Sequence, residues 1–355
     1  MGLNVEQKSR HPKNAWVKSA TYVALFGIMG CGFSACSLGK MTGNFMSSFA
    51  TEHVLPYTMT TRDLRLACAS GESQANSLLA FGRVMDAPPH LAAIGALQSA
   101  GTCMELAARE AELRRLRATF EGRPTLAIDE HTVAKQTHAQ AATRFYAAWK
   151  HAEAVFGEIG SRCPENAEDE LAYLLALTSG LLAVSHDGDA RHAAGVPREI
   201  LPQAMRGSEC LDNHKWWGVP AAIRVMVWLG VPGALPEGVD PWAVLADSTA
   251  LGDAAGVYVA RAFAAQAANA YGQPQLLCSQ IHSFGEQLTS ANADSRYALL
   301  NEVAAQTVWH ELNKLWMESK GYRAQSNTLE CYWDETNERI SLEPLPSPDE
   351  DEPQF

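Results

Sequence analysis

The chain alternates long stretches rich in Ala, Leu, Glu and Arg with short breaks that contain Gly and Pro. Apolar positions recur at helical spacing, and the Val/Ile alternation typical of β-strands is nearly absent. This pattern predicts an all-α fold in which successive helices, joined by short loops, pack as antiparallel hairpins. We expect helices at 38–53, 63–85, 91–120, 128–156, 168–184, 198–205, 220–229, 241–250, 254–271, 274–288 and 295–319.

Two of the predicted helices carry patterns that suggest their surroundings. Gly101 is a candidate break in the helix at 91–120. In the second half of that helix Glu105 and Arg109 are four residues apart, the spacing of a solvated ion pair. His138 in the next helix lies among Gln, Lys and Arg residues, which again indicates a wet surface.

The N-terminal residues have the pattern of an export signal. Basic residues precede an apolar run at 20–33, which is shorter than the ~20 residues that span a bilayer. A basic start, a short apolar segment and small residues at its end are typical of a secretory signal. The residues before Cys36, Phe33-Ser34-Ala35, resemble the processing site of a bacterial lipoprotein, which implies a lipid on Cys36. The basic residues are Lys8, Arg10, Lys13 and Lys18.

Two alternatives to this anchor stay open. Cys31 follows Ile28-Met29-Gly30 and is a competing lipid site, and the segment could instead stay as an uncleaved anchor helix. We prefer Cys36 because the apolar run before it is fuller and polar sequence follows at once. Ser37 stands where an Asp would favour the inner membrane, so we expect a periplasmic protein held by its lipid at the outer membrane.

Three segments follow from this interpretation: a signal peptide at 1–35, a helical body at 36–343 and an acidic, Pro-rich, disordered tail at 344–355. The whole chain of 355 residues has a net charge of −12. The signal segment carries four basic residues and one acid, so the mature chain has a net charge of −15. This charge, with no Lys/Arg patch, excludes nucleic acid as an expected partner.

Six cysteines besides Cys31 and Cys36 lie in the body, and an even number in an oxidising compartment suggests disulfides. Six cysteines allow fifteen connectivities, which the sequence alone does not resolve. We expect the sequential set, with buried free thiols as the alternative for any pair. The expected pairs are Cys68–Cys103, Cys163–Cys210 and Cys278–Cys331.

No catalytic motif is present: H-E-x-x-H, G-x-S-x-G, the P-loop and a G-x-G-x-x-G turn are all missing from the sequence. A polar segment at 185–196 contains His186, Asp187, Asp189 and His192, which are possible ligands for a divalent metal. No second matched set accompanies them, so we interpret the segment as a polar loop. We therefore expect no catalytic residues, no metal and no cofactor, with a metalloenzyme at this loop as a competing hypothesis.

The most distinctive local sequence is the segment 210–220, which contains the adjacent Trp216 and Trp217. Adjacent side chains point to different faces of a regular element, so at least one of them should pack in the core. The other is a candidate for lining a cleft or an interface, where Trp is enriched. With Trp228 and Trp242 nearby, these four residues form the predicted ligand or partner cleft, and a helix-hairpin core is the alternative.

The chain resembles the T-component (TatT) family associated with TRAP transporters, over roughly residues 36–320. The lipoprotein start at 36–42, the Ala-rich helical body, the segment 210–220 with Trp228, and Asp240-Pro241-Trp242 carry the resemblance. It implies a tetratricopeptide-like helical array that forms a homotrimer with a central pore. It also implies a non-enzymatic accessory that docks a periplasmic substrate-binding protein and passes a small ligand. A general envelope scaffold with a protein-binding groove is the alternative.

We predict that fatty-acid labelling of the full chain in a bacterial host is lost in Cys36→Ala, because this removes the thiol that carries the lipid. Cys31→Ala is the matched control and should keep the label. Label that persists in Cys36→Ala and disappears in Cys31→Ala would move the anchor to Cys31.

Overall fold

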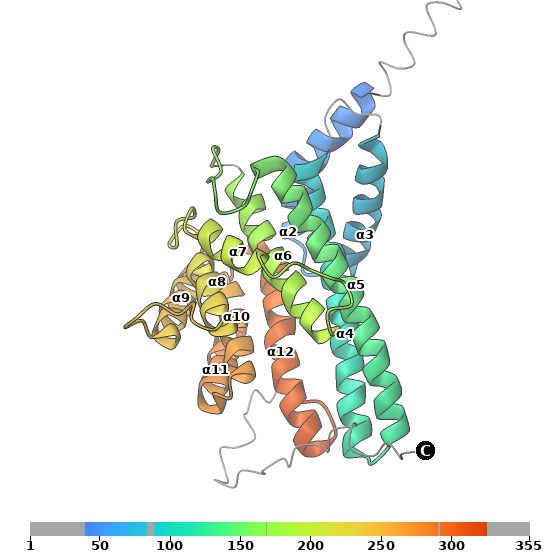
Figure 1. The fold of residues 1–355 in the computed structure, drawn as a ribbon, viewed down its shortest axis with the longest axis vertical. Coiled ribbons are helices and arrows are strands. Elements are labelled where there is room, and N and C mark those ends of the chain that lie inside the picture. The colour runs from blue at the N-terminus through green and yellow to red at the C-terminus, as the bar shows by residue number, and fades with distance from the viewer. Residues whose placement is uncertain (1–39, 84–88, 168, 290–291, 325–355) are drawn as a thin grey trace, which may run out of the picture.

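The computed structural model describes residues 40–83, 89–167, 169–289 and 292–324. Over these residues the protein is all-helical, with eleven α-helices and no strand, so the all-α prediction is confirmed (Figure 1). The signal segment with Cys31 and Cys36, the tail, and Cys331 lie outside the described residues.

The N-terminal half is built from long helices that each pack against the next. Residues 40–49 are helical and continue through a π-helical turn at Ala50–Val54. The neighbours α3 and α4, α4 and α5, and α5 and α6 make the largest helix contacts in this half. The helices are α2 (Leu55–Met59), α3 (Leu64–Phe81), α4 (His90–Phe120), α5 (Pro124–Phe156) and α6 (Glu170–Asp189).

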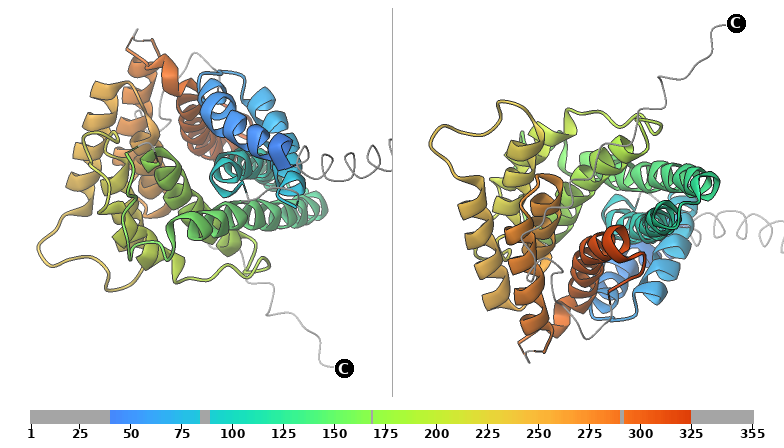
Figure 2. Two further views of the ribbon diagram at one scale, coloured as in Figure 1. Left: turned by 90° about the horizontal axis from the view of Figure 1, so that it is seen from above. Right: turned by 90° about the horizontal axis from the view of Figure 1, so that it is seen from below.

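The C-terminal half uses shorter helices and ends on one long helix, α12, which packs against both α10 and α4 (Figure 2). The last helix therefore closes the array by joining its two halves. The helices are α7 (Ile200–Ser208), α8 (Val219–Gly230), α9 (Pro241–Ala255), α10 (Val259–Ala270), α11 (Pro274–Thr289), a short 3-10 turn (Ser295–Tyr297) and α12 (Ala298–Lys320).

Helix ends follow the capping residues in the sequence. Asp63 accepts a hydrogen bond from the Leu66 amide and starts α3, and Asp240 does the same for α9, with Pro241 in the first turn. Gly256, at φ +70°, ends α9 in the left-handed conformation. The expected helix at 254–271 is therefore wrong at its start, because this glycine separates α9 from α10.

The glycine in the middle of α4 is a close contact between helices and not a break. A Cβ at Gly101 would lie 2.6 Å from the ring of Phe145 on α5, which is fully buried. The expected break at Gly101 is therefore wrong: α4 is continuous. The missing side chain lets α4 and α5 approach, and Phe145 fills the space.

Among the described helices, α4 is long and apolar enough to cross a membrane by length and composition alone. Within its apolar window, 61% of the residues are buried inside the protein. Its neighbours α3, α5, α6 and α12 cover it, so its apolar character is accounted for by the core.

The cysteines differ from the expected set at one pair. Cys163 and Cys210 form a disulfide that links the loop before α6 to the turn after α7. Cys68 and Cys103 are free thiols, so the expected bond between them is wrong. Both thiols donate to the carbonyl of Ser99, which holds them as hydrogen-bonded neighbours on α3 and α4. Cys278 is disulfide-bonded, and its pairing with Cys331 stays a prediction.

We predict that Gly101→Ala lowers the free energy of unfolding by about 1–3 kcal/mol, because the new methyl group overpacks against the Phe145 ring. Gly188→Ala on α6 is the control. Nothing lies within 4 Å of a Cβ there, so that variant should be neutral or gain about 0.5–1 kcal/mol. Chemical unfolding of the two variants measures the difference, and equal stabilities would contradict the close-contact role.

Candidate functional site

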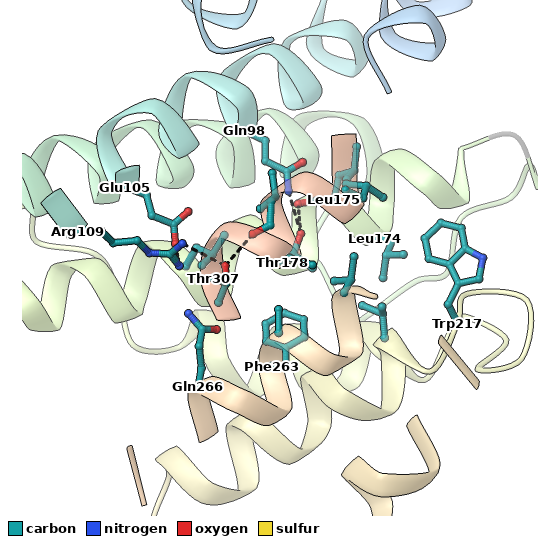
Figure 3. A pocket seen from close by; sticks show the side chains of 17 residues that line it. Gln98, Glu105, Arg109, Leu174, Leu175, Thr178, Trp217, Phe263, Gln266 and Thr307 are labelled. Atoms are coloured by element: carbon teal, nitrogen blue, oxygen red, sulfur yellow. Dashed lines mark hydrogen bonds and ion pairs between the residues drawn. The ribbon is translucent and has the colours of Figure 1, made fainter. Parts of the chain in front are cut away.

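A cavity of about 460 Å³ lies among α4, α5, α6, α7, α8, α10 and α12. We call it the polar chamber, because four carboxylates, three basic side chains and three histidines line it. A smaller, apolar pocket of about 80 Å³ adjoins it, and we call this the apolar arm. Both are lined by Glu105, Arg109, Leu182, Phe263 and Gln266, which therefore lie where the two meet. Figure 3 shows the lining of the apolar arm.

The ion pair of Glu105 and Arg109 stands at this junction. The guanidinium Nη2 lies 2.6 Å from Glu105 Oε1, and Nη1 donates to Thr307 Oγ1 of α12 at 3.1 Å (Figure 3). The expected solvated face is wrong here, because both charged side chains are buried under α12. Burial alone would raise the pKa of Glu105, but Arg109 and His186 outweigh it and hold the pKa at about 2.

A second carboxylate, Glu112, lies between two histidines. Its Oε1 is 3.1 Å from His138 Nε2 and its Oε2 is 3.0 Å from His310 Nε2. Burial would raise the pKa of Glu112, but the hydrogen bonds from the two rings move the pKa well below its usual value. Burial chiefly lowers the pKa of His310, whose Nδ1 has no hydrogen-bond partner.

A third cluster joins α5 to the last turn of α6. His138 Nδ1 lies 2.8 Å from His186 Nδ1 and 3.9 Å from Asp189 Oδ2. His186 Nε2 points toward Glu105 Oε1 at 3.6 Å and makes no hydrogen bond. The Phe145 ring stacks on His186 with centroids 5.6 Å apart, so the close contact at Gly101 also supports this imidazole. His138 is 4% exposed, which corrects its expected place on a wet surface.

The polar segment at 185–196 is divided between a helix and a loop. His186 and Asp189 lie three residues apart on the last turn of α6, so both reach the chamber. Asp187 points the other way, where its carboxylate accepts hydrogen bonds from the amides of 194–196. His192 is exposed beside it. The expected loop is therefore wrong for 185–189, because α6 continues to Asp189.

The apolar arm ends at Trp217 (Figure 3). This residue has φ +57°, a conformation that is uncommon for a bulky side chain and that stores strain. Its ring packs against Tyr297 with centroids 4.4 Å apart. A Cβ at the following Gly218 would lie 2.2 Å from the carbonyl oxygen of Ser248, so only glycine fits there. This turn sets the indole at the end of the arm.

The four predicted tryptophans do not form one cleft. Trp217 lines the apolar arm, whereas Trp216 packs edge-to-face against it and donates its indole N–H to Glu170 at 2.6 Å. Trp228 and Trp242 are half-buried against the main core, and neither lines the chamber or the arm. Of these four residues, Trp217 is the one that lines the site.

The charged residues of α4 and α12 that line the chamber were not predicted from the sequence as part of the site. Glu105, Arg109 and Glu112 are spaced by four and three residues, which places them on one face of α4. His310 and Glu311 on α12 complete the wall, and Lys314 pairs with Glu311 at 2.9 Å. The spacing of the α4 residues was the one pattern in the sequence that could have indicated this wall. Using it would have required knowing that α12 packs against α4.

Comparisons with protein-family models, with curated proteins and with solved structures find no match to this chain. Chemically, the site offers a cavity with an apolar end, one buried guanidinium, and a group of imidazoles facing carboxylates. Such an arrangement suits binding of an amphiphilic molecule or an ion.

We predict that Arg109→Met lowers the free energy of unfolding by about 3–5 kcal/mol, because it leaves the Glu105 carboxylate buried without its partner. Glu105→Gln/Arg109→Met removes both charges and should lose less. Arg114→Met is the surface control: its side chain is 49% exposed, and loss of its pair with Glu130 should cost within about 1 kcal/mol. Equal losses in the Arg109 single and double variants would contradict the pairing argument.

Proposed function

We propose that this protein is a non-enzymatic, lipid-anchored periplasmic accessory of a TRAP-type transport system that holds and passes a small ligand. One observation carries the proposal: a cavity between the helices that is charged at one end and apolar at the other. The lipoprotein-like N-terminus and the resemblance to the T-component family support the location and the partner.

The shape of the cavity indicates the kind of ligand. The arm is lined by Leu174, Leu175, Trp217 and Phe263, and its volume of about 80 Å³ suits a short apolar group. The chamber is several times larger and can hold a polar head group with water. A small amphiphile that places its apolar part against Trp217 and its polar part near Arg109 fits both spaces.

The partner and the assembly come from the resemblance. We propose that the helical hairpins form a tetratricopeptide-like array, that three copies assemble around a pore, and that a periplasmic substrate-binding protein docks on the assembly. The successive packing of α3, α4, α5 and α6 is compatible with such hairpins. Binding alone, with no chemical step, is sufficient for this function.

We predict that Val259→Trp abolishes co-purification of the natural ligand, because the indole fills the apolar arm that Val259 lines. Native mass spectrometry of the full chain, taken from membranes, measures the bound small molecule. Val133→Trp is the matched control, because Val133 is an exposed position on α5 and should leave ligand binding unchanged. Ligand bound equally by both variants would contradict the role of the arm.

The partner is tested separately, by cross-linking the anchored protein in intact cells and identifying what it captures. Specific enrichment of a solute-binding protein supports the transport role. Enrichment of none, under cross-linking that preserves weak contacts, contradicts it, and capture of assorted envelope proteins would instead favour the scaffold.

A further inference from the structure

We propose that the protein binds one divalent transition-metal ion, with Zn²⁺ as the best fit, through His138 Nδ1, His186 Nδ1 and Asp189 Oδ2. One ligand atom from each of these residues lies within 4.8 Å of the other two, at the wall of the polar chamber. The inference goes beyond the proposed transport role and does not depend on it.

The spacing of the three atoms suits a tetrahedral ion. Bonds of about 2.0–2.1 Å from Zn²⁺ to nitrogen or oxygen place neighbouring ligand atoms about 3.3 Å apart. The observed separations from His138 Nδ1 are 2.8 Å to His186 Nδ1 and 3.9 Å to Asp189 Oδ2, on either side of that value. Asp189, at the end of α6 with a half-exposed side chain, has the freedom to close the remaining gap. Two imidazoles with one carboxylate are typical ligands of such metals.

The carboxylates behind the histidines are arranged as a metal site requires. Metal-bound histidines usually donate their other ring N–H to a carboxylate, which fixes the tautomer and the ring orientation. Glu112 Oε1 lies 3.1 Å from His138 Nε2, and Glu105 Oε1 lies 3.6 Å from His186 Nε2. Both rings therefore turn Nδ1 toward the same point and Nε2 toward a carboxylate.

The hydrogen bonding of the histidine pair is incomplete without an ion. If the rings are neutral, one Nδ1 must donate to the other at 2.8 Å, and the donor ring then has no proton on Nε2. A bare Nε2 would face a carboxylate, and His186 Nε2 is indeed a buried atom with no partner. An ion at the two Nδ1 atoms favours the tautomer of both rings that has its proton on Nε2, so the one proton between the rings moves to Nε2 of the donor ring and each N–H faces a carboxylate, Glu112 or Glu105. An added proton on the pair would satisfy the same atoms, and metal titration separates the two cases.

Charge and access also favour an ion at this point. Glu112 and Asp189 have no Arg or Lys in ion-pair contact among the described residues, whereas Glu105 is paired with Arg109. Three protein ligands leave the fourth position of a tetrahedral ion open toward the chamber that they line.

A second histidine pair in the protein has similar geometry but lacks the carboxylates of this site. His90 and His151 also meet through Nδ1 atoms, at 2.7 Å. In the part of the chain that the structure describes, neither ring has a carboxylate in ion-pair contact, so this pair lacks both the third ligand and the orienting acids. It serves as an internal comparison.

The test is titration of the full chain in detergent with ZnCl₂, after chelator treatment and with a tag that contains no histidine. We expect one Zn²⁺ per chain, a rise in thermal stability on binding, and intense Co²⁺ absorption typical of tetrahedral coordination. His138→Ala and His186→Ala should each weaken Zn²⁺ binding by roughly 100-fold or more, and Glu112→Gln by roughly 10–100-fold.

The controls keep a structural effect apart from a ligand effect. His131→Ala lies on the same helix as His138 but outside the chamber lining, and should bind Zn²⁺ as the parent does. Circular dichroism of the metal-free variants confirms that they fold, and Asp189→Asn tests the third ligand without changing its size. The proposal is overturned if the parent binds no Zn²⁺, or if His138→Ala/His186→Ala retains it and His90→Ala/His151→Ala loses it.

Discussion

A charge removed from water must find a partner inside the protein, and this requirement organises the centre of the molecule. Glu105 and Glu112 project from α4 toward the chamber, where Arg109 of the same helix, His138 of α5 and His310 of α12 meet them. α12 completes these contacts, because it supplies His310 to Glu112 and the Thr307 hydroxyl to Arg109. The packing of α12 against α4 therefore both closes the helical array and completes the wall of the polar chamber.

Local order could be predicted from the sequence far better than the environment of the side chains. The helices follow from periodicity, Asp caps and Pro in first turns, all of which act over a few residues. Gly101 was misinterpreted because a glycine that breaks a helix and one that admits a neighbouring ring look alike in one sequence. The prediction that Glu105 and Arg109 form a solvated pair was wrong for the same reason. Their spacing fits an exposed surface and a buried contact equally well. The deciding residue, Thr307, lies 198 positions from Arg109.

The site itself was predictable only in fragments. The histidines of 185–196 were recognised as possible ligands, but His186 acquires its meaning from His138, which is 48 residues away on another helix. Trp217 was found through its unusual neighbourhood, yet its place at the end of the arm depends on a left-handed turn and on Tyr297. With neutral histidines the chamber holds one more carboxylate than basic groups. A divalent ion would reverse this sign, so metal content would decide whether a cationic or an anionic head group is preferred.

The contact between Arg109 and Thr307 also has a consequence for biogenesis. In a chain synthesised from its N-terminus, α4 emerges early and α12 emerges after all the other described helices. Until α12 docks, Arg109 lacks the Thr307 hydroxyl and Glu112 lacks His310, so the wall of the chamber is incomplete. Because Arg109 and Thr307 are 198 positions apart, the docking of the final helix is expected to be a late and slow step of folding. A chain that lacks α12 would keep its other helices and lose one wall of the chamber, so the complete chamber forms only after the last helix has docked.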